Sequence, residues 1–210
     1  MKTYIFDFDG TLVDSMPYYA PTMLSLLDEY GISYGDDIIK KITPLGFLGS
    51  AKYFIELGLP LSVEEIANIL GSRLLKVYSE IIPAKSNVIS TLKELKARGC
   101  DLNILTASPH VTLDACASRL GLDTLMTNVW SCDDFATTKA DPNIYRMAAQ
   151  RLGKDVSEII FIDDNPNADR TAKQAGMTVY GIYDESSKEY VDEMKSFCHR
   201  YIYDFSELLD

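Results

Sequence analysis

Two acidic residues follow a short apolar run near the start of the chain. The strand-like run at residues 3–8 leads into the letters DFDGT at residues 7–11, which place carboxylates at Asp7 and Asp9. If the chain stays extended there, the two side chains point to the same side. Carboxylates this close repel each other unless one is protonated or a cation lies between them, and either condition suits catalysis. The alternative is a solvated turn in which Asp and Gly serve as turn formers.

A second acidic pair, Asp163 and Asp164, comes directly after four apolar residues at 159–162. Carboxylate oxygens with few imidazoles nearby suit magnesium rather than zinc. The chain has two histidines and four cysteines without CxxC pairing, so no zinc-ligand cluster can be drawn. The alternative for this pair is an acidic turn before a helix, with Asp as the N-cap.

Two more predicted strand ends carry groups that suit an anion. The letters TASP at residues 106–109 offer a hydroxyl and backbone N–H groups just before a predicted helix start, which together can bind an anion. A simple helix cap is the alternative there. Lys139 follows the next predicted strand. A lone lysine on a loop is usually a solvated charge, but beside Asp7 it would balance carboxylates and phosphate.

The elements that must position these side chains alternate regularly from residue 87 onward. Each helical pattern ends at a glycine, which closes a helix in the left-handed conformation, and a short apolar run follows. Alternating strands and helices predict a parallel sheet covered on both faces, with ligands at the carboxyl ends of its strands. The predicted strands are 3–8, 101–105, 128–131, 158–162 and 178–182, with 201–203 as a possible edge strand, and the predicted helices are 87–98, 109–120, 141–152 and 167–175.

The stretch between the first two strands shows helical patterns without a convincing strand between them. One helix begins at Ser15, and Ser62 with Glu65 forms a capping box that opens another. We therefore predict an α/β fold in which a small helical domain is inserted after the first strand. The predicted core comprises residues 1–14 and 84–210, and the predicted insertion comprises residues 15–83.

Composition limits the classes of partner. The net charge of −11 argues against broad electrostatic binding to nucleic acid or to an anionic membrane, since both need clustered Lys and Arg. The first residues show no signal-peptide pattern, and no apolar run approaches the ~18 residues that a membrane helix needs. Scattered cysteines are expected to be reduced and mostly buried, which predicts a cytoplasmic protein. Oligomeric state is open.

The chemistry that these side chains suit is phosphoryl transfer. Asp7 and Asp164 would hold a magnesium ion that binds one phosphate oxygen. Asp7 would attack phosphorus to form an aspartyl-phosphate, and Asp9 would protonate the leaving alcohol and then deprotonate the attacking water. Thr106 and Lys139 would stabilise the equatorial oxygens. The backbone N–H groups predicted to help bind phosphate are those of Gly10, Ala107 and Ser108.

These residues resemble the motifs of the haloacid dehalogenase (HAD) superfamily, subfamily I, in the branch that includes β-phosphoglucomutase and phosphoglycolate phosphatase. The letters DFDGTLVDS at residues 7–15 resemble its first motif, Thr106 its second, Lys139 its third and Asp163-Asp164 its fourth. The order and separations match over the whole chain. The resemblance implies a Rossmann-like core with a helical cap domain inserted after the first strand, and a hydrolase that uses Mg²⁺.

The resemblance also refines the metal site and the reaction. It implies that the backbone carbonyl of Asp9, rather than its carboxylate, binds magnesium. Many members have another acid where this chain has Ala168, so Asp163 or the neighbouring Asp169 would supply the second acidic contact. Dehalogenases of the family lack the second acid of the first motif, which is Asp9 here. A phosphomonoester of a small metabolite is therefore the expected substrate.

Two alternatives remain at this point. A sugar-phosphate mutase would have to exclude water, and the family's β-phosphoglucomutases carry a histidine about where Tyr19 falls here, which favours hydrolysis. A phospho-accepting or phosphate-binding module, similar to response-regulator receivers, also places acids and a lysine at strand ends. Such modules are shorter, have no inserted helical domain, and would leave Asp9 without a clear role.

The sequence does not identify the substrate. In this family the cap closes over the core and selects the leaving group. The basic residues of the insertion that could contact a substrate are Lys52, near a predicted loop at residues 46–49, and Arg73 or Lys76 on the capping-box helix. Each is also compatible with an ordinary solvated charge.

Overall fold

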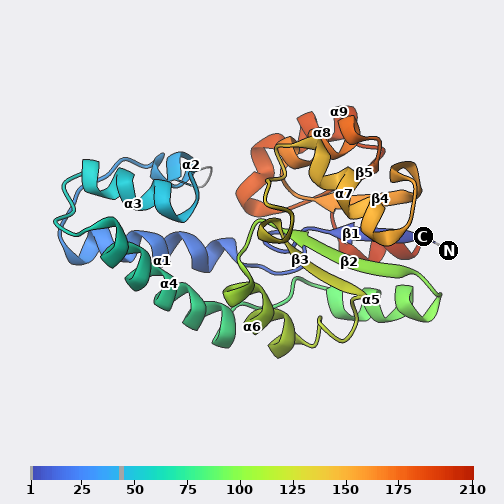
Figure 1. The fold of residues 1–210 in the computed structure, drawn as a ribbon, viewed down its shortest axis with the longest axis horizontal. Coiled ribbons are helices and arrows are strands. Elements are labelled where there is room, and N and C mark those ends of the chain that lie inside the picture. The colour runs from blue at the N-terminus through green and yellow to red at the C-terminus, as the bar shows by residue number, and fades with distance from the viewer. Residues whose placement is uncertain (1, 43–44) are drawn as a thin grey trace. The chain divides into compact units, whose positions relative to one another are not determined.

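The computed structural model describes residues 2–42 and 45–210. The chain forms two compact units: Met1–Ser15 with Ile82–Asp210, called the core unit here, and Met16–Ile81, called the helical unit. The core unit is a six-stranded sheet flanked by helices, and the helical unit contains α1 to α4 (Figure 1).

All neighbouring strands of the sheet run parallel, in the order β3-β2-β1-β4-β5-β6. The residues of β1 are all buried, and so are those of β4, which explains why both are continuous apolar runs rather than alternating ones. This is the predicted Rossmann-like arrangement. The strands are β1 (Thr3–Phe6), β2 (Asp101–Thr106), β3 (Asn128–Ser131), β4 (Ile159–Asp163), β5 (Thr178–Ile182) and β6 (Arg200–Ile202).

Helices cover both faces of this sheet, with α7 and α8 on one side and α5 on the other (Figure 1). The start of α7 shows why the sequence folds as predicted: Asp141 accepts a hydrogen bond from the backbone N–H of Asn143 at 2.9 Å, and Pro142 occupies the first turn. The helix ends at Gly153, whose φ is +64°. The core helices are α5 (Val88–Ala97), α6 (His110–Leu120), α7 (Pro142–Leu152), α8 (Pro166–Ala175) and α9 (Val191–Phe197).

The first strand is shorter than predicted. It ends at Phe6, because the chain turns at Phe8, whose carbonyl accepts from the backbone N–H groups of both Leu12 and Val13 at 2.9 and 3.0 Å. The chain is therefore not extended from Asp7 to Asp9, and the two side chains do not share one side of a strand as predicted. The edge strand is also displaced by one residue from the predicted 201–203.

The helical unit consists of α1 (Met16–Glu29), α2 (Ile38–Ile42), α3 (Gly46–Glu56) and α4 (Val63–Glu80). The predicted capping box is confirmed: the Ser62 hydroxyl accepts from the Glu65 N–H at 3.2 Å, and Glu65 accepts from the Ser62 N–H at 2.8 Å. The predicted loop at residues 46–49 is wrong, because these residues begin α3. Both glycines of this stretch, Gly46 and Gly49, lie in the first turns of the helix.

Two expectations from composition can be compared with the structure. Among the helices of the described residues, none combines the length and the apolar character needed to cross a bilayer. All four cysteines are free thiols, of which Cys116 and Cys132 are buried and the other two are partly exposed.

Candidate active site

Three carboxylates meet where the central strands end. The pairing of Phe6 with Ile162 places Asp7 beside Asp163, and the Asp7 N–H donates to the Ile162 carbonyl at 2.8 Å. Each of Asp7, Asp163 and Asp164 offers a carboxylate oxygen within 4.8 Å of the others, and all three residues are buried. We call these three residues the acidic cluster. The parallel register of β1 and β4 thus brings together residues more than 150 positions apart.

Lys139 contacts two residues of the acidic cluster. Its ammonium donates to Asp7 Oδ1 and, at 2.8 Å, to Asp163 Oδ2, and only 13% of its side chain is exposed. Tyr145 contacts the loop that carries Lys139: its hydroxyl donates to the Lys139 carbonyl at 3.1 Å. The Tyr145 ring packs edge-on against Phe161 of β4 in the buried core. Tyr145 therefore links the backbone of Lys139 to the packed core.

The end of β2 holds the other acid of the first motif. The Ser108 hydroxyl donates to Asp9 Oδ2 at 2.5 Å, and the Ser108 N–H donates to Thr106 Oγ1 at 3.1 Å. Asp9 therefore contacts the side chain of Ser108, whereas Asp7 contacts Lys139 within the acidic cluster. Thr106 is buried and Ala107 is exposed. The two acids of the first motif therefore have different partners.

Residues 7–13, called the 7–13 turn here, fit closely against Asp164 through Gly10 and Thr11. The Thr11 hydroxyl donates to Asp164 Oδ1 at 3.3 Å. Gly10 has a φ of +75°, and a Cβ there would lie 2.7 Å from Asp164 Oδ1, so only glycine fits. The Gly10 N–H donates to the Val13 carbonyl at 2.9 Å, inside the turn. The predicted phosphate contact of this N–H remains a prediction.

The acidic cluster carries more negative charge than its lysine can balance. Burial raises the pKa of Asp7 to about 7, the charge of Asp163 adds to the rise, and Lys139 opposes it. Burial, followed by Asp163 and Asp7, raises the pKa of Asp164 well above its ordinary value. Burial disfavours the charged form of Lys139, but Asp163 and Asp7 outweigh this and raise its pKa well above normal.

This imbalance suits a hard divalent cation. The acidic cluster supplies three buried carboxylates and neither imidazole nor thiolate, which is the donor set that Mg²⁺ prefers. In their ionised forms these three carboxylates carry more negative charge than the ammonium of Lys139 balances, and a divalent ion would neutralise the excess. The residues present therefore fit the metal that the sequence analysis expects.

The raised pKa of Asp7 predicts a pH dependence of stability without metal. Because its folded pKa of about 7 exceeds the ordinary 3.8, folding favours the protonated form, and this stabilisation is lost as the pH rises from about 4 through 7. We therefore compare the unfolding free energies of Asp7→Asn and the unsubstituted protein in EDTA. Their difference should shift in favour of Asp7→Asn by at least ~1 kcal/mol as the pH rises from 5 to 8. Urea unfolding at several pH values measures this gain. Parallel pH curves for the two proteins would contradict it.

Sequence reasoning missed two charged residues next to the 7–13 turn. The Lys85 ammonium donates to the carbonyls of Gly10 and Tyr183, both at 2.6 Å, and to Asp184 Oδ2 at 2.9 Å. Asp184 follows β5 by two residues, so extending the strand-end rule to this fifth strand would have found it. Lys85 carries no such signal, since nothing local distinguishes it from a surface lysine.

Asp169, the acid next to Ala168, lies outside the acidic cluster. Asp169 is fully buried, and its Oδ2 accepts from the Cys198 thiol at 3.4 Å. Burial raises its pKa well above the ordinary value. Asp163, not Asp169, belongs to the acidic cluster. Of the two candidates for a second acidic contact, the geometry therefore favours Asp163.

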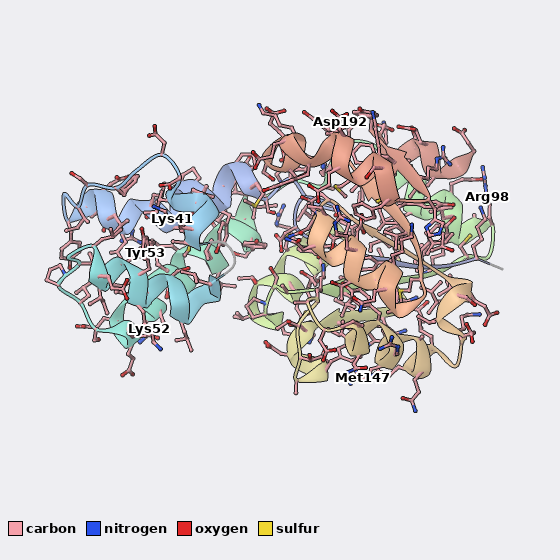
Figure 2. All side chains as sticks on the ribbon, turned by 90° about the horizontal axis from the view of Figure 1, so that it is seen from above. Lys41, Lys52, Tyr53, Arg98, Met147 and Asp192 are labelled. Atoms are coloured by element: carbon pink, nitrogen blue, oxygen red, sulfur yellow. The ribbon has the colours of Figure 1, made fainter. Side chains whose placement is uncertain are left out.

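The three basic candidates of the helical unit differ in their surroundings. Lys52 and Lys76 are exposed, and Lys52 can be followed on α3 in Figure 2. Arg73 is half-buried and donates at 2.7 Å to both the Ser25 hydroxyl and Glu29 of α1. This pairing holds α4 against α1. A substrate contact for any of the three stays a prediction.

Comparison with known proteins gives one family and several relatives. The family model of haloacid dehalogenase-like hydrolases matches residues 1–176. Pyrophosphatase PpaX from Bacillus velezensis is 29% identical over 179 residues, which cover 85% of this chain and 81% of that protein.

Solved structures agree with the fold. A protein from Haemophilus somnus, predicted to be a phosphoglycolate phosphatase, superposes with a TM-score of 0.84 at 21% identity, covering 100% of this chain and 96% of the other. A Thermotoga maritima protein provisionally named a β-phosphoglucomutase gives a TM-score of 0.81 at 22% identity, covering 100% and 98%. At 21% and 22% sequence identity, this structural similarity shows a shared fold and nothing more.

Proposed function

Because the chain belongs to the haloacid dehalogenase-like hydrolases, we propose that it is a magnesium-dependent phosphatase that hydrolyses a small phosphomonoester through an aspartyl-phosphate on Asp7. The observation that supports this proposal most strongly is the buried carboxylate of Asp7, held by Lys139 within the acidic cluster. A nucleophilic carboxylate needs a fixed position and a means of staying ionised. The relative from Bacillus velezensis is itself named a pyrophosphatase, which supports a substrate with a phosphoryl group.

Asp7 attacks phosphorus only in its ionised form. Burial raises its pKa, so positive charge must hold it ionised at neutral pH. Lys139 supplies part of that charge and fixes one carboxylate oxygen. A magnesium ion held by Asp7 and Asp164, with Asp163 and the Asp9 carbonyl alongside, would supply the remaining charge and polarise a phosphate oxygen.

Asp9 moves the protons. As Asp7 attacks and the bond from phosphorus to the leaving oxygen breaks, Asp9 donates its proton to that oxygen, which leaves as an alcohol. Ionised Asp9 then accepts a proton from the water that attacks the aspartyl-phosphate. The bond between phosphorus and Asp7 breaks, which restores the carboxylate and releases phosphate. The Ser108 hydroxyl at 2.5 Å keeps Asp9 oriented in both steps.

The remaining groups bind the phosphate oxygens. The Thr106 hydroxyl accepts from the Ser108 N–H at 3.1 Å, so its own proton is available to a phosphate oxygen. The N–H of Ala107 and the Lys139 ammonium are the other proposed donors. Such donors contribute most when they stay in place while charge develops on the oxygens.

We assign substrate choice to the helical unit. Its helices would act as the cap that selects the leaving group, with the exposed Lys52 and Lys76 as candidate contacts for an anionic substrate. Arg73 is a weaker candidate, because its guanidinium already binds Ser25 and Glu29.

The proposal is tested by measuring phosphate release from a panel of small phosphorylated metabolites, with pyrophosphate and phosphoglycolate included. With Mg²⁺ we expect turnover of at least one member of the panel, and EDTA should abolish it, because the acidic cluster then lacks its cation. Restored Mg²⁺ should restore activity. Phosphate release that survives EDTA would contradict the metal role, and isomer formation without phosphate release would indicate a mutase instead.

A further inference from the structure

Lys85 joins the returning chain to the 7–13 turn by two contacts. Its backbone N–H donates to the Leu12 carbonyl at 3.0 Å, and its ammonium donates to the Gly10 carbonyl at 2.6 Å. One residue earlier, Ala84 pairs with Val13 in an antiparallel bridge. The segment that re-enters the core unit therefore lies against the turn that carries Asp7.

The ammonium of Lys85 has its full set of acceptors. Besides Gly10 it binds the Tyr183 carbonyl at 2.6 Å and Asp184 Oδ2 at 2.9 Å, which uses all three of its N–H donors. Only 18% of the Lys85 side chain and 5% of the Asp184 side chain are exposed. A solvated surface charge would show neither this burial nor this coordination.

The contact with Gly10 matters because Gly10 also packs against Asp164 of the acidic cluster. Gly10 packs so closely on Asp164 that a Cβ would lie 2.7 Å from its carboxylate. The Gly10 N–H donates to the Val13 carbonyl inside the turn, and the Gly10 carbonyl accepts from Lys85 outside it. Lys85 therefore contacts the peptide group that joins Gly10 to Thr11, and the Thr11 hydroxyl in turn donates to Asp164 Oδ1 at 3.3 Å.

We propose that Lys85 is a positioning residue for the proposed phosphatase reaction: through the Gly10 carbonyl it holds the 7–13 turn in the conformation that keeps Asp7 and Asp9 in place. This inference rests on the function proposed above. Its competitor is a purely structural role, in which Lys85 serves only to neutralise the buried carboxylate of Asp184.

Two variants separate these roles. Lys85→Met keeps the aliphatic stem but removes the ammonium, which costs both the Gly10 contact and the partner of Asp184. The double variant Lys85→Met with Asp184→Asn removes the unpaired charge but does not restore the Gly10 contact. Lys188→Met is the matched control, because Lys188 forms an exposed ion pair with Glu185 on the neighbouring segment.

The readouts are melting temperature, kcat and KM with Mg²⁺, and hydrogen exchange of the amides of Gly10, Leu12 and Val13. We expect Lys85→Met to lower kcat by roughly 10- to 100-fold with KM changed less than about threefold, the scale that small misplacements of reacting groups produce. The double variant should recover the melting temperature but not kcat. Amide exchange in the turn should be faster in both Lys85 variants and unchanged in Lys188→Met.

The inference is overturned if the double variant regains the kcat and the amide exchange of the unsubstituted protein, because Lys85 would then serve only its ion pair. If the proposed function fails, the unsubstituted protein releases no phosphate from any substrate. If only the role of Lys85 fails, the unsubstituted protein is active and the double variant has the same kcat.

Discussion

Asp7→Asn is expected to lower kcat for phosphate release by roughly 10⁴-fold or more, the scale seen when a covalent enzyme loses its nucleophile. The amide keeps the size of the side chain but cannot form a stable acyl-phosphate, so the first chemical step is lost rather than slowed. The substitution also removes one buried negative charge, so the variant should fold at least as well as the unsubstituted protein at pH 8 without metal. Kinetics and urea unfolding measure the two effects.

A matched change elsewhere on the sheet supplies the control. Asp101 begins β2, at the end of the strand opposite to Thr106, so Asp101→Asn makes the same chemical change away from the acidic cluster. It should leave kcat within about twofold, as is usual for surface substitutions. Turnover that persists in Asp7→Asn at a level comparable to Asp101→Asn would remove Asp7 from the role of nucleophile.

Lys139→Met should have the second-largest effect. It removes the ammonium that contacts both Asp7 and Asp163, and we expect kcat to fall by roughly 10²- to 10³-fold, as for other single electrostatic donors. Two buried carboxylates lose their cation at the same time, so metal-free stability should fall by about 3 kcal/mol, the range for a broken buried pair. Excess Mg²⁺ should recover part of the stability but little of kcat.

Lys93→Met is the control for this change, because Lys93 is an exposed lysine on α5. It should alter neither kcat nor the melting temperature. An unchanged kcat in Lys139→Met would show that the ammonium takes no part in the reaction, whatever its distance from Asp7. A loss of stability without loss of kcat would assign it a purely structural role.

The strands and helices of the core unit were largely predictable because local signals agree with the tertiary structure there. Asp141-Pro142 starts α7 and Gly153 ends it, as capping chemistry requires. The rule that parallel strands bring their carboxyl ends to one edge then placed Asp7 beside Asp164 without any knowledge of contacts between them.

The failures have equally physical causes. The end of β1 was misplaced because the hydrogen bonds that close the turn at Phe8 compete with the strand, and a run of apolar letters does not reveal them. Lys85 was missed because the value of a lysine depends on which acceptors surround it, and these lie at Gly10 and Asp184, far away in sequence. The helix at residues 46–56 was missed because its glycines suggested a loop.

The central claim is that Asp7 itself carries the phosphoryl group, and chemical trapping tests it most directly. The enzyme is quenched during turnover and treated with borohydride, which reduces an acyl-phosphate to an alcohol but leaves a free carboxylate intact, and the modified residue is then located by mass spectrometry. With an activated substrate whose leaving group needs no proton, such as an aryl phosphate with an acidic phenol, Asp9→Asn still allows the first step but cannot activate the water, so it should increase the trapped fraction. We predict reduction at position 7 alone. Reduction at another carboxylate, or full turnover without any trapped residue in either protein, would contradict the mechanism.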